Sequence, residues 1–246
     1  MSNQPLNYSS QHTDQSVLAT NKVIRNTYAL LSMTLLFSGA SAAFSMAMQL
    51  PHPGIIITLL GYFGLLFATM KLRNSVWGIA CIFALTGFMG LTLGPILTAY
   101  LSLPNGGLIV SKAMVATAVI FLSLSAYAIT SKKDFSFMGG FLMVGIIVAF
   151  LAGLGAIFFA IPALSLGVSA MFVLLMSGLI LYETSNIIHG GERNYVMATI
   201  GLYVSIYNLY MKKCLKTKKS YRDIWLRHFY LVDKLVLRVC QRQILG

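Results

Sequence analysis

Long apolar runs with almost no charged residues dominate the sequence between residues 22 and 211. An α-helix needs roughly 20 residues to cross a hydrocarbon core of about 30 Å, and these runs reach or approach that length. Of the 246 residues, 57% are hydrophobic and only 10% are charged, too few for the surface of a soluble domain. The sequence therefore predicts an all-α integral membrane protein.

About seven transmembrane helices are predicted, joined by short, turn-rich connections that leave no room for a soluble domain. The predicted ranges are Tyr28–Gln49, Gly54–Met70, Val76–Tyr100, Ala113–Thr130, Met138–Phe159, Ala163–Ile188 and Tyr195–Met211. Residues 1–21 are polar and do not resemble a signal peptide, so we expect a disordered arm before the bundle of residues 22–211. Residues 212–246 form a basic tail.

Lysine and arginine gather in every second connection, starting before the first predicted helix. The connections on this side carry Lys22, Arg25, Lys71, Arg73, Lys132, Lys133 and Arg193, whereas the alternate connections hold only Lys112. By the positive-inside rule, this pattern predicts that the N-terminus lies in the cytoplasm.

The formal net charge of +12 is concentrated in the tail, since ten of the eighteen basic residues and two of the six acids fall in residues 212–246. The tail therefore carries +8 and the preceding 211 residues carry +4. Basic residues that flank apolar segments contact lipid headgroups, so we expect membrane lipid and not nucleic acid as a partner. If the last helix spans, the tail lies on the outer side, where the rule disfavours such charge.

Glu183 is the one charged residue deep in a predicted span, where insertion scales put the cost of a carboxylate at about 2.5 to 3.5 kcal/mol. Asn186 is three residues further along the same helix face, and Ser205 and Asn208 share a face of the last helix, so these side chains could line one polar centre. Two interpretations stay open. Glu183 binds protons or cations, or it is a structural hydrogen-bond anchor, with Ser205 and Asn208 holding helices together.

Other chemistry finds little support in the sequence. Calcium needs six to eight oxygen ligands, normally from several carboxylates, so we expect no bound metal or cofactor, although weak passage of calcium or protons stays open. Cys81, Cys214 and Cys240 form no CxxC or Cys/His pattern of a disulfide framework or zinc site. No catalytic motif is present, so an enzyme is not predicted. A transporter ranks last, because only Gly94-Pro95 interrupts a helix.

Small residues recur at four-residue spacing in two predicted helices. They are Gly39 and Ala43 in the first, and Gly145, Ala149 and Gly153 in the fifth. Small side chains let helix backbones approach closely in lipid. We interpret both sets as internal packing, with a homo-oligomer interface as the alternative.

The stretch Leu181–Tyr210, LYETSNIIHGGERNYVMATIGLYVSIYNLY, closely resembles the end of the Bax inhibitor-1 (TMBIM) family, specifically its bacterial YccA branch. Glu183-Thr184 resembles the family's acidic-Thr pair, Leu202–Leu209 resembles its LYVSxYN string, and the N-terminal segment TNKVIRNTYALLSMTLLFSGASA agrees. The resemblance covers residues 20 to 210. It implies six helices around a central seventh, and an inner-membrane modulator that inhibits the ATP-dependent membrane protease FtsH.

Two departures from the family pattern bear on these expectations. Other members conduct calcium in a pH-dependent way through an acidic pair, but here Ser205 stands at the second position, so the pair is incomplete. One carboxylate can still take up a proton, and a pH-sensitive calcium or cation leak centred on Glu183 is the alternative function. The family's last helix also continues as a leucine-rich run, whereas MKKCLKTKKSYRDIW follows Tyr210 here. A changed reading frame near Met211 is one hypothesis; a surface amphipathic helix, LRHFYLVDKLVLRVC, is another.

Overall fold

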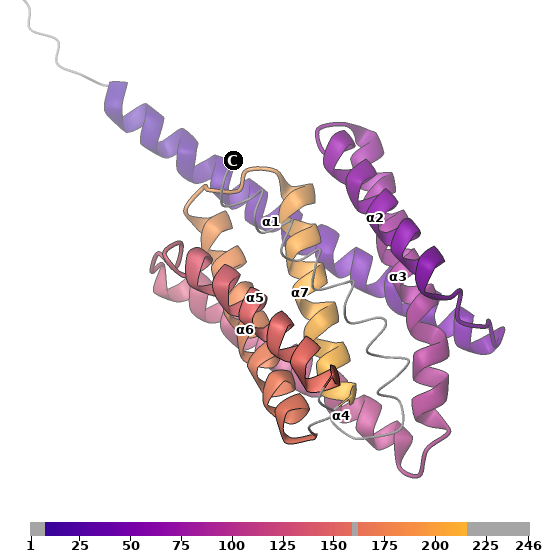
Figure 1. Ribbon diagram of the computed structural model, residues 1–246. Helices are drawn as coiled ribbons and strands as arrows, with labels where there is room; N and C mark the ends of the chain where they lie inside the picture. The colour runs from indigo at the N-terminus through magenta and orange to yellow at the C-terminus, as the bar shows by residue number, and fades with distance from the viewer. Residues whose placement is uncertain (1–7, 159–161, 216–246) are drawn as a thin grey trace, which may run out of the picture.

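The computed structural model describes residues 8–158 and 162–215, and within these ranges the chain forms seven helices and no strand. The helices are α1 (Tyr8–Ala47), α2 (Ile55–Leu72), α3 (Val76–Leu101), α4 (Gly106–Ser131), α5 (Met138–Phe158), α6 (Pro162–Ile188) and α7 (Tyr195–Leu215) (Figure 1). The all-helical prediction is confirmed, and most helix ends lie within a few residues of those predicted.

Four helices of the described ranges are long and apolar enough to cross a membrane. The stretches that qualify are Thr20–Ala47, Val76–Leu101, Gly106–Ser131 and Gly167–Ile188. Two shorter apolar stretches, Ile56–Leu72 in α2 and Met138–Gly153 in α5, accompany them. Length and composition thus agree with the predicted class of membrane protein.

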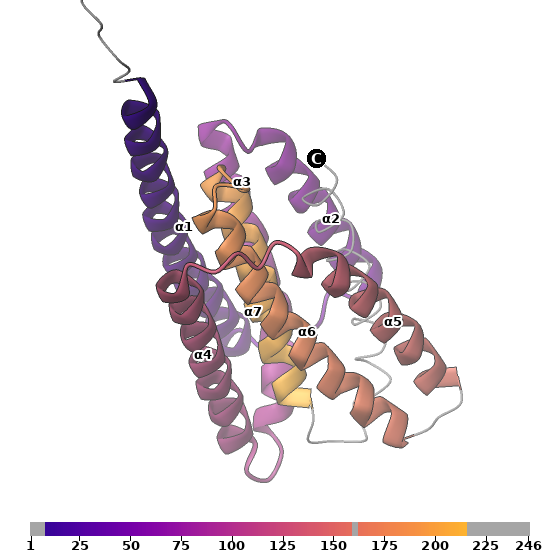
Figure 2. The same ribbon diagram turned by 90° about the vertical axis from the view of Figure 1, so that its left-hand side faces the viewer.

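The first helix begins much earlier than predicted. It starts at Tyr8 rather than Tyr28, so residues 8–21, expected to be disordered, are helical. Extending a helix that already exists costs far less than nucleating a new one. The helix formed by the apolar stretch after Thr20 can therefore propagate backward into the polar residues 8–19. The N-terminal part of α1 projects past the ends of the other helices (Figures 1 and 2).

The fourth helix also begins earlier, at Gly106 rather than Ala113. Asn105 adopts a left-handed conformation with φ of 61°, and the helix starts at the next residue. A Cβ atom on Gly106 would overlap the main-chain oxygen of Tyr100. The glycine therefore permits a tight turn out of α3, and α4 begins seven residues before the predicted Ala113.

Packing joins helices that are distant in the sequence. α1 lies against α3 and α7, α4 lies against α6 and α7, α2 packs mainly on α3, and α5 packs mainly on α6 (Figures 1 and 2). α7 is buried continuously from Val196 to Met211, although its sequence is less apolar than those of α2 to α6. Its polar side chains consequently face other helices.

The structure separates the two sets of small residues. A Cβ atom on Gly145 would lie 2.6 Å from Leu175 Cδ2 in α6, and Ala149 is fully buried, which confirms internal packing for α5. By contrast, a Cβ atom on Gly39 would meet nothing within 4 Å, and Ala43 is exposed. Internal packing is therefore the wrong interpretation for the Gly39 and Ala43 pair.

Close approach of α1 and α3 depends instead on two glycines of α3 that lie outside the predicted packing sets. A Cβ atom on Gly90 would overlap the main-chain oxygen of Ser38, and one on Gly94 would overlap the Ser45 side chain. The Ser45 hydroxyl donates across this contact to the main-chain oxygen of Leu91, over 2.9 Å. Glycines of α3 that face Ser38 and Ser45 of α1 thus set this interhelical distance.

Candidate functional site

Three consecutive residues near the end of α6, Glu183, Thr184 and Ser185, each bond a different neighbour. Successive residues of an α-helix point about 100° apart around its axis. Glu183 accordingly faces α7, Thr184 faces α1 and α4, and Ser185 faces the connection between α4 and α5. All three are buried, so this segment of α6 is a polar junction inside an apolar bundle.

The Glu183 carboxylate is held against α7. The Ser205 hydroxyl donates to Glu183 Oε2 over 3.1 Å, and Glu183 is only 7% exposed. A Cβ atom on Gly201 would lie 2.6 Å from Glu183 Oε1, so the carboxylate rests directly on the helix backbone where a side chain is missing. Gly201 was not foreseen, because an isolated glycine in a helical run carries no sign of what packs against it.

Within the described residues, Asn208 and Asn186 form hydrogen bonds with other groups and not with the Glu183 carboxylate. The Asn208 side-chain nitrogen donates to the main-chain oxygen of Val204, over 2.9 Å. The Asn186 side-chain oxygen sits where a Cβ atom on Gly191 would be, and its main-chain oxygen accepts from the Gly191 nitrogen at 2.9 Å. The structure thus brings Ser205 to Glu183, while Asn186 shapes the end of α6.

Thr184 connects three helices. Its hydroxyl lies 3.4 Å from the Tyr28 hydroxyl of α1 and 3.5 Å from the Ser125 hydroxyl of α4. Nearby, the Thr199 hydroxyl of α7 lies 3.3 Å from the main-chain oxygen of Thr27 in α1. Tyr28 and Ser125 were not predicted as site residues, since single hydroxyls in apolar runs form no pattern.

A second polar face of α7 points toward α1 and α3. The Tyr203 and Ser38 hydroxyls lie 2.6 Å apart, and the Tyr203 hydroxyl also donates to the main-chain oxygen of Thr86 at 3.4 Å. The Tyr207 ring stacks on the Tyr203 ring with centroids 6.2 Å apart, and its hydroxyl bonds Thr92. α7 therefore presents Ser205 to α6 and a tyrosine face to α1 and α3.

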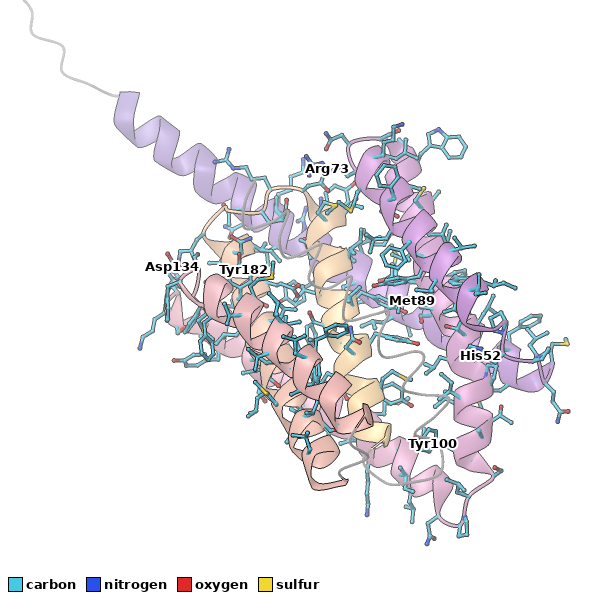
Figure 3. All side chains as sticks on the ribbon, in the orientation of Figure 1. His52, Arg73, Met89, Tyr100, Asp134 and Tyr182 are labelled. Atoms are coloured by element: carbon cyan, nitrogen blue, oxygen red, sulfur yellow. The ribbon has the colours of Figure 1, made fainter. Side chains whose placement is uncertain are left out.

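The loops at the Glu183 end of the bundle are also joined to one another. Asn194 begins α7: its side-chain oxygen accepts from the main-chain nitrogens of Val196 and Met197. Its side-chain nitrogen donates to the main-chain oxygen of Arg73 and to Asn74 Oδ1, in the α2–α3 connection. Figure 3 shows Arg73 and Asp134 toward this end, and His52 and Tyr100 toward the other.

Asp134 lies in the α4–α5 connection, outside the spans. The hydroxyl and main-chain N–H of Ser136 donate to its carboxylate, and these bonds hold the pKa of Asp134 below its usual value. Asp134 is fully exposed and is thus charged at neutral pH.

No group of three or more His, Cys, Asp or Glu side chains converges within the described ranges. Glu183 has a hydroxyl as its partner, and no basic side chain of the described residues contributes to its electrostatics. The arrangement can hold a proton on a carboxylate inside the bundle, and it offers too few oxygen atoms for a tight calcium site.

Comparison with known protein families identifies the family of this chain. The family model described as inhibitor of apoptosis-promoting Bax1 matches residues 20–213. The chain belongs to the Bax inhibitor-1 family. The match to the Bax inhibitor-1 model includes every residue of the Glu183 junction and stops near the start of the basic tail.

Bacterial members of the Bax inhibitor-1 family match closely over most of their length. An uncharacterized protein of Pseudomonas aeruginosa is 57% identical over 77% of this chain and 85% of its own. The protein called modulator of FtsH protease YccA, from Escherichia coli K12, is 52% identical over 82% of this chain and 92% of its own. An uncharacterized membrane protein of Vibrio cholerae is 44% identical over 80% of this chain.

The predicted resemblance to the Bax inhibitor-1 family and its YccA branch is therefore confirmed. The predictions about residues 216–246, including the changed reading frame and the surface amphipathic helix, lie outside the described residues. The ion- or proton-sensing role of Glu183, Ser205, Asn208 and Asn186 stays a prediction.

Proposed function

We propose that this protein modulates an FtsH-type membrane protease by binding it within the inner membrane, as a regulator rather than an enzyme. The observation that carries the proposal is the 52% identity to the modulator of FtsH protease YccA over 92% of that protein. Identity at this level over nearly the whole of that protein supports a shared fold, and we infer a shared mode of action from it.

The proposed mechanism is occupation or shielding of the membrane-facing opening of the protease. The outer faces of the helices are apolar, as a partner inside a bilayer requires; prominent exposed residues are Leu36, Phe44, Ile56, Leu60, Phe67, Val115, Leu122, Phe141 and Leu174. The start of α1, which projects past the other helices, would lie on the cytoplasmic side of the membrane beside the protease. Binding in this way would inhibit degradation of other membrane proteins.

We infer that all seven helices cross the membrane, six of them around α7, with the N-terminus in the cytoplasm. The burial of α7 from Val196 to Met211 supports its central position. The alternation of basic and nearly uncharged connections supports the orientation, since the Arg73 and Asp134 loops lie at one end of the bundle and His52 lies at the other (Figure 3). The full crossing of α7 belongs to this inference.

Crosslinked co-purification from native membranes tests the proposal. The tagged full-length protein and a version ending at Met211 are purified side by side, and FtsH is detected by immunoblot. Recovery of FtsH with both is expected, because the match to the family ends at residue 213. Absence of FtsH from both preparations would contradict the proposal, and recovery with the full-length protein alone would assign binding to the tail.

A proton or cation leak centred on Glu183 is a second candidate function. The observation that favours it is a buried carboxylate whose partner in the described chain is a neutral hydroxyl, Ser205, rather than a basic side chain. Buried ionisable residues in membrane helices commonly mark ion or proton paths. Flux through proteoliposomes should fall in Glu183→Gln but not in a conservative lipid-facing variant such as Leu122→Ile; equal flux in all three, or none, rules this candidate out.

A further inference from the structure

The connection between α4 and α5 is fastened to the end of α6 by Ser185 and His189, which lie one turn apart on that helix end. The Phe135 main-chain N–H donates to Ser185 Oγ over 2.9 Å, and Ser185 Oγ lies 3.3 Å from the main-chain oxygen of Lys133. His189 Nε2 lies 3.1 Å from the main-chain oxygen of Lys132. Three of the four residues from 132 to 135 are therefore bonded through their main chains to these two side chains.

His189 also bonds back to its own helix. Its Nδ1 lies 2.9 Å from the main-chain oxygen of Ser185 and 3.3 Å from Ser185 Oγ. Each ring nitrogen thus faces a carbonyl oxygen, which can only accept a hydrogen bond. A doubly protonated imidazolium satisfies both carbonyls, and the Ser185 hydroxyl is then free to donate to Lys133.

A neutral imidazole distributes the hydrogens differently. With its proton on Nε2, His189 still donates to Lys132, but the Nδ1 lone pair then faces the Ser185 carbonyl oxygen. The Ser185 hydroxyl relieves this repulsion by donating its hydrogen to Nδ1. The hydroxyl then no longer donates to the main-chain oxygen of Lys133. With the proton on Nδ1 instead, the bond to Lys132 is lost. Either neutral form costs the loop one hydrogen bond.

We propose that Ser185 and His189 form a pH-dependent latch, in which protonation of His189 transfers the Ser185 hydroxyl hydrogen to the loop and fastens the α4–α5 connection onto α6. The latch sets how firmly the start of α5 is docked, since α5 packs mainly on α6 and Gly139 lies against the Tyr182 ring there. By the proposed orientation this end faces the cytoplasm, so the latch would report cytoplasmic acidification.

Charged groups around His189 come from three connections or helix ends. Asp134 interacts electrostatically with His189. Lys132 and Lys133 belong to the same loop, Glu192 and Arg193 follow α6, and Lys22 and Arg25 follow Thr20, which lies beside Gly190. α5 brings no charged residue. Because the pKa of Asp134 lies below its usual value, that carboxylate stays charged from pH 5 to 8, the range in which histidines commonly titrate.

Hydrogen–deuterium exchange of the full-length protein in lipid nanodiscs at about pH 5.5 and 7.5 tests the latch. After correction for the intrinsic pH dependence of exchange, protection of the peptide containing Phe135 should rise about fivefold at the lower pH, the effect of one hydrogen bond on a local opening equilibrium. The α2–α3 connection, where the Ser75 nitrogen bonds the Leu72 oxygen, serves as an internal reference without a histidine.

Two variants and one control make the result decisive. His189→Gln, at an exposed position, should abolish the pH response, and Ser185→Ala should abolish it while retaining the histidine. His52→Gln, at the opposite end of the bundle, should leave the response intact (Figure 3). A pH response that persists in His189→Gln, or that is missing from the wild-type protein, overturns the proposal.

Discussion

At the scale of the residue, the bundle accommodates polar groups by matching each one to a specific gap or partner. Glu183 rests where Gly201 has no side chain, and its second oxygen accepts from Ser205. Tyr203 is fully buried, but its hydroxyl reaches both Ser38 and the Thr86 main chain. In lipid, where water cannot complete a missing hydrogen bond, such local matches decide which buried residue can be changed.

Gly201→Ala should destabilise the protein by about 1 to 3 kcal/mol, because the new Cβ atom would lie 2.6 Å from Glu183 Oε1 and force the carboxylate or α7 to move. Gly64→Ala is the matched control, since a Cβ atom there meets nothing within 4 Å, and it should be neutral or slightly stabilising. Unfolding of both in mixed micelles of increasing SDS content measures the difference. Equal stability of the two variants would contradict the prediction and show that α6 and α7 leave room for a methyl group at position 201.

Tyr203→Phe should lower the free energy of unfolding by about 1 kcal/mol, because it removes the hydroxyl that bonds Ser38 in α1. Tyr62→Phe is the control. The Tyr62 hydroxyl is buried with no hydrogen-bond partner in the described chain, so its removal should be neutral or stabilising. The same SDS titration distinguishes them, and a larger loss for Tyr62→Phe would contradict this ranking.

At the scale of the element, helix ends matter as much as helix faces. Asn194 both caps α7 and ties it to the α2–α3 connection, so one side chain sets the start of one helix and the position of another. Ser185 and His189 do the corresponding work between α6 and the α4–α5 connection. These ties explain how loops of only a few residues hold neighbouring helices in register.

Asn194→Ala should destabilise α7 by about 1 kcal/mol or more, because it removes both the cap and the bonds to Arg73 and Asn74. Asn194→Asp keeps an oxygen for capping and adds a favourable charge at the helix N-terminus, but it loses the amide donors, so an intermediate loss is expected. Thermal unfolding of detergent-solubilised protein gives the order. An aspartate variant as unstable as the alanine variant would assign the whole effect to the bonds between the Asn194 amide and the α2–α3 connection.

At the scale of the whole molecule, the proposed arrangement makes a topological prediction. In a background with Cys81, Cys214 and Cys240 replaced by serine, Asn105→Cys should react with a membrane-impermeant maleimide added to the outside of spheroplasts. Asn74→Cys should react only after the membrane is opened, because the α2–α3 connection lies on the other side. Labelling of both from outside would contradict the orientation and the crossing of α3.

The sequence by itself determined the class of the protein, the family and most helix ends, because hydropathy, span length and turn residues act locally. It also identified Glu183 as the buried carboxylate and Ser205 as a neighbour on the next helix, since both stand at defined positions in short motifs. It failed for the start of α1, where propagation from an apolar span extended the helix into a polar segment.

Only the tertiary structure decided which faces meet. It alone showed that Gly201 makes room for the carboxylate, that Tyr28 and Ser125 reach Thr184, and that Gly39 faces outward while Gly90 of α3 makes the close contact. These contacts join residues far apart in the chain. In a membrane protein both lipid-facing and buried surfaces are apolar, so hydropathy does not distinguish one face of a helix from another, and interhelical packing decides it.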